Sequence, residues 1–167
     1  MEQDNRRPVA SSPSQPLPTI LRPRLIYLAA PLFTQAERSA NLGLCKQLEE
    51  HIGDVFLPQR DGLLLQDIRG TGTARQSTAV GEVFSSDLRA LEQSMIVVAV
   101  LDGVAVDEGV AFELGYAYAK GKFCVGFSTD SRRGAGYFKN PMCEGSIVDT
   151  FCHESSLIQR LKQFARA

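Results

Sequence analysis

The residues best suited to chemistry in this sequence are carboxylates. Five acidic residues fall close together in the chain: Asp87, Asp102, Asp107, Glu108 and Glu113. Two carboxylates in one crevice can cleave a glycosidic bond, with one acting as the nucleophile and the other handling the proton. This part of the chain is therefore the first candidate for a catalytic site.

Glu113 is the most informative of these residues. It lies within Gly109-Val-Ala-Phe-Glu113-Leu-Gly-Tyr, early in an expected helix and among apolar neighbours. The helix macrodipole favours a charged carboxylate near the N-terminus, so Glu113 could act as a nucleophile at neutral pH. Glu113 could instead do no more than stabilise the first helical turn, and its position alone does not separate the two roles.

Three aspartates could be the proton-handling partner, and each also has an ordinary structural explanation. Asp87 could cap a helix after Ser86, Asp102 precedes Gly103 in a common turn pair, and Asp107 could cap the next helix.

The chain alternates short apolar strands with amphipathic helices. Strands are predicted at 25–30, 55–57, 96–101, 123–127 and 147–151. Helices are predicted after a Thr34–Glu37 capping box, from around Ser85, from about 110 to 120, and after a Ser155 cap. The stretch from Gly62 to Gly81 is predicted to be mostly a long loop or a short irregular helix. The alternation indicates an α/β fold: a doubly wound, flavodoxin- or Rossmann-like sheet of about five parallel strands with helices on both faces.

In such a sheet, ligands bind in the crevice outside the carboxyl ends of the strands. The sequence contains neither a G-x-G-x-x-G nor a G-x-x-x-x-G-K-[ST] motif, so nothing predicts a dinucleotide or triphosphate cradle. Its four cysteines and two histidines lack the spacing of metal ligands. We therefore expect no cofactor and no metal.

Composition narrows the class of protein further. The 167 residues carry 18 basic and 19 acidic side chains, a net charge of −1, which argues against a nucleic-acid binder. No apolar run is long enough to span a bilayer, so no membrane partner is expected. Residues 1–23 are polar and proline-bearing and are predicted to form a disordered leader before a single domain at 24–167. Free thiols would fit a reducing cytoplasm.

Four separated motifs resemble those of the nucleoside 2-deoxyribosyltransferase family. They are Tyr27-Leu-Ala-Ala-Pro-Leu-Phe33, Ser86-Asp87-Leu88, Asp107-Glu-Gly-Val-Ala-Phe-Glu113-Leu-Gly-Tyr and Asn140-Pro-Met142, in consistent order over roughly residues 24–150. The chain departs from some members at its end, where Phe164-Ala-Arg-Ala stands in place of a terminal tyrosine.

The resemblance implies a role for each catalytic residue. Glu113 would attack C1′ of a deoxyribose to form a covalent glycosyl-enzyme, and Tyr27 would orient it by a hydrogen bond. Asp87 would contact the nucleobase and shuttle its proton, which requires an environment that raises its pKa. Asp107 would hold the sugar hydroxyl.

Binding residues and partners follow from the same resemblance. Asn140 and Met142 would reach the 5′ end of a nucleoside bound in a neighbouring subunit, so a homo-oligomer is expected. Phe33 and Gly109, which lie within the motifs, are expected to contact the substrate. Gln59 and Asp61 could hydrogen-bond a base edge, although Asp-Gly is more commonly used to form a turn.

The implied activity is exchange of the base of a 2′-deoxyribonucleoside with a free base, in nucleoside salvage. The loops at 30–33 and 58–62 resemble those of the purine-restricted branch.

One alternative is an N-glycosidase in which water replaces the acceptor base. Hydrolytic relatives that act on 5′-monophosphates tend to have serine where this chain has Asn140, which argues against the phosphate-cleaving version. Another alternative is a non-catalytic nucleotide-sensing module. Arg132 and Arg133 are expected to be solvated loop charges.

Overall fold

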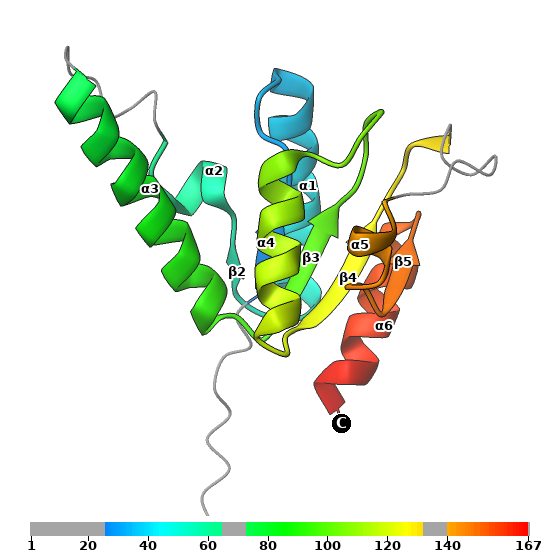
Figure 1. The fold of residues 1–167 in the computed structure, drawn as a ribbon. Helices are drawn as coiled ribbons and strands as arrows, with labels where there is room; N and C mark the ends of the chain where they lie inside the picture. The colour runs from blue at the N-terminus through cyan, green and yellow to red at the C-terminus, as the bar shows by residue number, and fades with distance from the viewer. Residues whose placement is uncertain (1–25, 65–72, 132–139, 167) are drawn as a thin grey trace, which may run out of the picture.

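The structure is a computed structural model that describes residues 26–64, 73–131 and 140–166. In it, the chain forms a five-stranded parallel sheet in the order β2-β1-β3-β4-β5 (Figure 1). The strands are β1 (Ile26–Ala29), β2 (Val55–Phe56), β3 (Ile96–Val100), β4 (Phe123–Phe127) and β5 (Asp149–Phe151). This order confirms the predicted doubly wound fold and its parallel sheet. The predicted leader at 1–23 lies outside the described residues.

Helices cover both faces of the sheet. They are α1 (Gln35–His51), α2 (Pro58–Asp61), α3 (Thr73–Gln93), α4 (Glu108–Ala119), α5 (Pro141–Glu144) and α6 (Glu154–Arg166). Buried residues of α1 and α6 pack on one face, and buried residues of α3, α4 and α5 pack on the other. Within the described ranges, no helix combines the length and the apolar character needed to cross a bilayer.

Alternation along the strands builds the two halves of the core. In β1, Ile26 and Leu28 join the cluster beneath α1 and α6, whereas Tyr27 and Ala29 join the cluster beneath α3 and α4. Successive side chains of a strand point to opposite faces, so both halves are apolar only because β1 and β3 are apolar throughout. The same alternation turns Tyr27 toward α4.

Two helix starts differ from the predictions. The helix expected to begin around Ser85 is the 21-residue α3, which begins at Thr73, so most of the predicted 62–81 loop that the structure describes is helical. Gly81 suggested an interruption there, yet a single glycine costs a helix only about 1 kcal/mol. The last helix begins at Glu154, and the Leu157 amide donates to the His153 carbonyl, so Ser155 is not its cap. The Thr34–Glu37 capping box of α1 is confirmed.

The packing of α4 predicts which leucines stabilise the fold. Leu114 of α4 is fully buried against the sheet, whereas Leu42 of α1 is about half exposed. We expect Leu114→Ala to lower the free energy of unfolding by about 2–5 kcal/mol, because it removes apolar contacts and leaves a cavity. Leu42→Ala is the matched control and should cost well under half as much. Urea unfolding followed by circular dichroism measures both, and equal losses would contradict this packing.

Candidate active site

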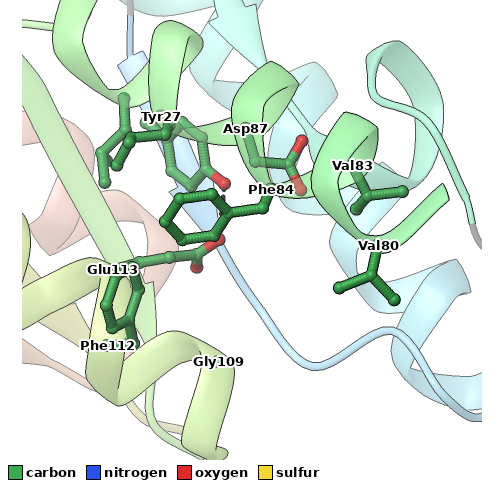
Figure 2. Close-up of a pocket in the computed structure, with 10 residues that line it drawn as sticks. Tyr27, Val80, Val83, Phe84, Asp87, Gly109, Phe112 and Glu113 are labelled. Atoms are coloured by element: carbon green, nitrogen blue, oxygen red, sulfur yellow. Dashed lines mark hydrogen bonds between the residues drawn. The ribbon is translucent and has the colours of Figure 1, made fainter. Parts of the chain in front are cut away.

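A pocket of about 250 Å³ lies between β1, α3 and α4. Its walls are mostly apolar, and three polar residues are among those that line it: Tyr27, Asp87 and Glu113 (Figure 2). The remaining lining residues are Val80, Val83, Phe84, Leu88, Leu91, Gly109 and Phe112. The pocket reaches from the start of α4 along the face of the sheet to Tyr27, and so extends beyond the predicted crevice at the carboxyl ends of the strands.

A partly buried hydrogen bond joins two of the three polar residues. The Tyr27 hydroxyl donates to Glu113 Oε1 over 2.5 Å, and Figure 2 shows the two groups turned toward each other. The Tyr27 side chain is fully buried, and its ring stacks on Phe56 at a centroid distance of 5.6 Å. Burial and the neighbouring Glu113 charge raise the pKa of Tyr27 far above its ordinary value, so its hydroxyl stays a donor at any physiological pH.

The environment of Glu113 differs from the one expected of a residue early in a helix. Burial raises the pKa of the Glu113 carboxyl group to about 7, helped by the negative charges of Asp87 and Asp107, while the Tyr27 hydrogen bond opposes the rise. The macrodipole was expected to keep this carboxylate charged. Desolvation outweighs any such favourable effect, so protonated and ionised forms coexist at neutral pH.

Asp87 reaches the pocket from the interior of α3, so the prediction that it could cap a helix is wrong. Its Oδ1 atom is buried and has no hydrogen-bond partner among the residues that the structure describes. Burial raises the pKa of Asp87 to about 6, as the proton-shuttling role would require. The pocket thus holds two carboxyl groups that both change protonation near neutral pH, a property suited to acid–base catalysis.

The other two aspartate candidates lie outside the pocket lining. Asp107 caps α4, because its Oδ1 accepts from the Gly109 amide at 2.9 Å and from the Val110 amide at 3.1 Å. Asp107 therefore has the capping role suggested as its ordinary explanation, and its charge still acts on Glu113.

Asp102 fixes the loop that follows β4. Its carboxylate accepts from the Thr129 amide and hydroxyl, both at 2.6 Å, and from the Asp130 amide at 2.9 Å. The side chain is therefore engaged with the next loop along the sheet edge.

Gln59 and Asp61, expected to read a base edge, are bonded to their own chain. The Gln59 amide donates to the Arg38 carbonyl at 2.8 Å and accepts from Asn41 at 2.9 Å. The Asp61 carboxylate accepts from the Leu57 amide and from the Arg60 guanidinium, both at 2.8 Å. These bonds tie α2 to its surroundings, and neither residue lines the pocket.

Phe33, Asn140 and Met142 also lie outside the pocket lining. Phe33 is 71% exposed and Met142 is 82% exposed. Asn140 caps the short helix α5, because its Oδ1 accepts from the Met142 amide at 2.9 Å. The Asn140 segment therefore presents an exposed methionine on the α5 side of α4. Arg132 and Arg133 lie outside the described residues.

Sequence reasoning missed part of the apolar wall. Val80, Val83, Phe84 and Phe112 line the pocket, and the rings of Phe84 and Phe112 lie 5.9 Å apart. The signal was present, because apolar residues recur every three or four positions from Val80 to Leu91, as on one face of a helix. The glycines of this stretch obscured it.

The comparisons with known proteins agree with this fold. Residues 26–153 match the family model described as nucleoside 2-deoxyribosyltransferase. The chain is similar to the crystal structure of a conserved protein from Enterococcus faecalis V583, with 27% identity and a TM-score of 0.72 over 85% of this chain and 99% of that one. It is also similar to a 2-deoxyribosyltransferase from the psychrotolerant bacterium Bacillus psychrosaccharolyticus, with 24% identity and a TM-score of 0.63 over 80% and 90% of the two chains. No match was found among curated proteins.

The raised pKa of Glu113 predicts how stability depends on pH. Because the folded pKa of about 7 exceeds the ordinary value of 4.5, the folded state binds more protons in this window, and stability falls as the pH rises through it. Glu113→Gln removes the part of this decline that Glu113 causes. We expect the variant to gain on the order of 2–3 kcal/mol over the wild type between about pH 5 and about pH 8. Urea unfolding at both pH values measures the gain, and a constant difference between the two proteins would contradict it.

Proposed function

Because the chain belongs to the nucleoside 2-deoxyribosyltransferase family, we propose that it exchanges the base of a 2′-deoxyribonucleoside with a free base, in nucleoside salvage. The observation that carries this proposal is that Glu113, its hydrogen-bonded Tyr27 and Asp87 all line one apolar pocket. A carboxylate nucleophile, a group that orients it and a second carboxyl group for the proton are what two successive displacements at C1′ need.

In the first displacement, the Glu113 carboxylate attacks C1′ of the bound nucleoside. The bond from C1′ to the base breaks, and its electrons pass to the base nitrogen as that base takes the proton of the Asp87 carboxyl group. The products are a glycosyl ester on Glu113, an Asp87 carboxylate and a neutral base. Burial of Asp87 supplies the acid for this step, because it raises the pKa of Asp87 to about 6 and so keeps a protonated fraction near neutral pH.

The second displacement reverses the first with a different base. A nitrogen of the incoming base attacks C1′, the ester bond breaks, and Asp87 accepts the proton that the base loses. Because each displacement inverts C1′, the product keeps the β configuration. The proposed reaction draws its nucleophile and its acid from the protein and needs neither metal nor cofactor.

Tyr27 acts in this proposal as the residue that orients Glu113. Its hydroxyl is held to Oε1, which leaves Oε2 as the oxygen that attacks. The hydrogen bond also favours the ionised form of a glutamate that burial would otherwise neutralise. Asp107 lies close enough for its charge to act on Glu113, and we propose that it also contacts the sugar hydroxyl from its capping position.

The apolar wall supports transfer over hydrolysis. Val80, Val83, Phe84 and Phe112 offer a base apolar and aromatic surface, and a base bound there would exclude water from the glycosyl ester. A purine preference is supported by the resemblance of the loops at 30–33 and 58–62 to the purine branch. Phe33, Gln59 and Asp61 of these loops would then act by shaping the neighbourhood of the site rather than by lining this pocket. Gly109, which does line the pocket, would allow the substrate to approach the start of α4.

We also propose that the chain works as a homo-oligomer in which Asn140 and Met142 complete a neighbouring site. The exposure of Met142 and the absence of both residues from the lining of the chain's own pocket support this arrangement, as far as the described residues go. A small deoxynucleoside would otherwise remain open to solvent on one side.

A single incubation tests the activity. The protein is mixed with deoxyinosine or thymidine together with free adenine, and all products are separated by chromatography. We expect deoxyadenosine to form, faster from deoxyinosine than from thymidine, and Glu113→Ala to lower the rate by about 10³-fold or more because it removes the nucleophile. Full exchange by Glu113→Ala would overturn the mechanism. Release of free deoxyribose without exchange would indicate a hydrolase, and no turnover of any deoxynucleoside would indicate a binding module.

Mixing inactive variants tests the shared site. Subunits carrying Glu113→Ala and subunits carrying Asn140→Ala should each be weakly active, and mixed oligomers should recover activity, because one site then has an intact Glu113 and receives Asn140 from its neighbour. Mixing Glu113→Ala with Asp87→Ala is the matched control. No recovery is expected there, since both residues line the pocket of the same chain. Equal behaviour of the two mixtures would show that Asn140 does not act across an interface.

A further inference from the structure

Gly62, directly after α2, lies against the carboxyl group of Asp87. A Cβ atom at position 62 would come within 2.9 Å of Asp87 Oδ1 and within 2.7 Å of the Pro58 carbonyl oxygen. Real Cβ atoms do not approach other heavy atoms this closely, so any side chain at position 62 would displace its neighbours. Figure 1 shows α2 beside α3, the helix that carries Asp87.

Backbone conformation does not explain the glycine. Gly62 has a φ of −90° and a ψ of −176°, an extended conformation that any residue can adopt. Glycine at the end of a helix is usually selected for a positive φ, and that reason does not apply here. Lack of space therefore excludes a side chain at position 62, and the nearest side-chain atom to an added Cβ belongs to Asp87.

The Asp87 oxygen on this side is the atom left without a partner. Oδ1 is buried and receives no hydrogen bond from any part of the chain that the structure describes. Burying an unpaired carboxyl oxygen is costly unless the group is protonated or a ligand satisfies it. In Figure 2, the Asp87 carboxyl group points away from the Tyr27–Glu113 pair.

We propose that Gly62 is a positioning residue for Asp87: its missing side chain lets the end of α2 close over Oδ1 and hold the carboxyl group in the buried orientation from which it exchanges a proton with the base. This role rests on the proposed function of Asp87 as the proton donor. The end of α2 thus supplies a backbone wall that excludes water and offers no competing hydrogen bond. The charged side chains of α2 do not disturb Asp87, because Arg60 and Asp61 pair with each other at 2.8 Å.

The titratable groups that act on Asp87 from the other elements come from β1 and α4. The Asp87 charge raises the pKa of Tyr27 and of Glu113, so both groups lie near enough for that charge to act on them. Burial is the cause that raises the pKa of Asp87 itself. A change at Gly62 that admits water would therefore lower the pKa of Asp87 directly, and would act on Tyr27 and Glu113 only through the altered Asp87 charge.

The test is the titration of Asp87 in Gly62→Ala. In protein labelled with ¹³C at aspartate carboxyl groups, the Asp87 signal is identified by its loss in Asp87→Asn and followed by NMR across the pH range. In the wild type we expect a pKa of about 6, and in Gly62→Ala a fall toward the ordinary 3.8, because the added methyl group displaces the carboxyl group into solvent. The matched control is Gly43→Ala on α1, where an added Cβ meets no described atom within 4 Å. An unchanged Asp87 titration in a folded Gly62→Ala protein would overturn the proposal.

A second variant covers the case in which Gly62→Ala does not fold. The double variant Gly62→Ala, Asp87→Ala keeps the approach to the Pro58 carbonyl but removes the carboxyl group. Recovery of the folded state in the double variant supports the proposal. If neither variant folds, the close approach to the Pro58 carbonyl alone explains why position 62 is glycine, and the proposal is overturned. The NMR readout needs no turnover, so it remains decisive even if the exchange assay shows that the proposed function is wrong.

Discussion

The hydrogen bond from the Tyr27 hydroxyl to Glu113 depends on the way this sheet is built. Tyr27 belongs to β1, which has a neighbouring strand on each side, and Glu113 belongs to α4, which crosses that face of the sheet. The packing of α4 on the sheet brings the two groups together, and the same packing removes the water that would otherwise solvate the Glu113 carboxylate. The raised pKa of Glu113 and the position of the tyrosine donor are therefore two results of the same packing.

The helix α3 forms the other side of the site, where it places a carboxyl group among apolar side chains. One face of α3 carries Val80, Val83 and Phe84 along the pocket, and the same face places Asp87 among them. A carboxyl group in such surroundings loses solvation and changes protonation nearer to neutral pH. The apolar wall and the proton-carrying group are thus inseparable, since the wall creates the environment that the proposed acid–base role needs.

Three other aspartates form hydrogen bonds that hold helix starts and a loop in place. Asp107 holds the first turn of α4, Asp102 holds the loop after β4, and Asp61 holds the start of α2. In each case a carboxylate satisfies backbone amides that would otherwise lack partners, a common use of aspartate at helix and strand ends. The acidic residues that the sequence brings together therefore divide into structural and pocket-facing groups, and spacing alone does not separate them.

The amino-acid sequence by itself determined the sheet, because its central strands β1 and β3 are apolar on both faces and its strands alternate with helices, a pattern typical of a parallel sheet covered on both sides. It also determined that Tyr27 and Glu113 belong to motifs of one family. Only the tertiary structure decided that α3 runs unbroken through Gly81, that Asp87 rather than Asp102 or Asp107 lines the pocket, and that Gly62 lies against Asp87. These features depend on contacts between residues far apart in the chain, and desolvation, which sets the pKa of both pocket carboxyl groups, exists only once those contacts have formed.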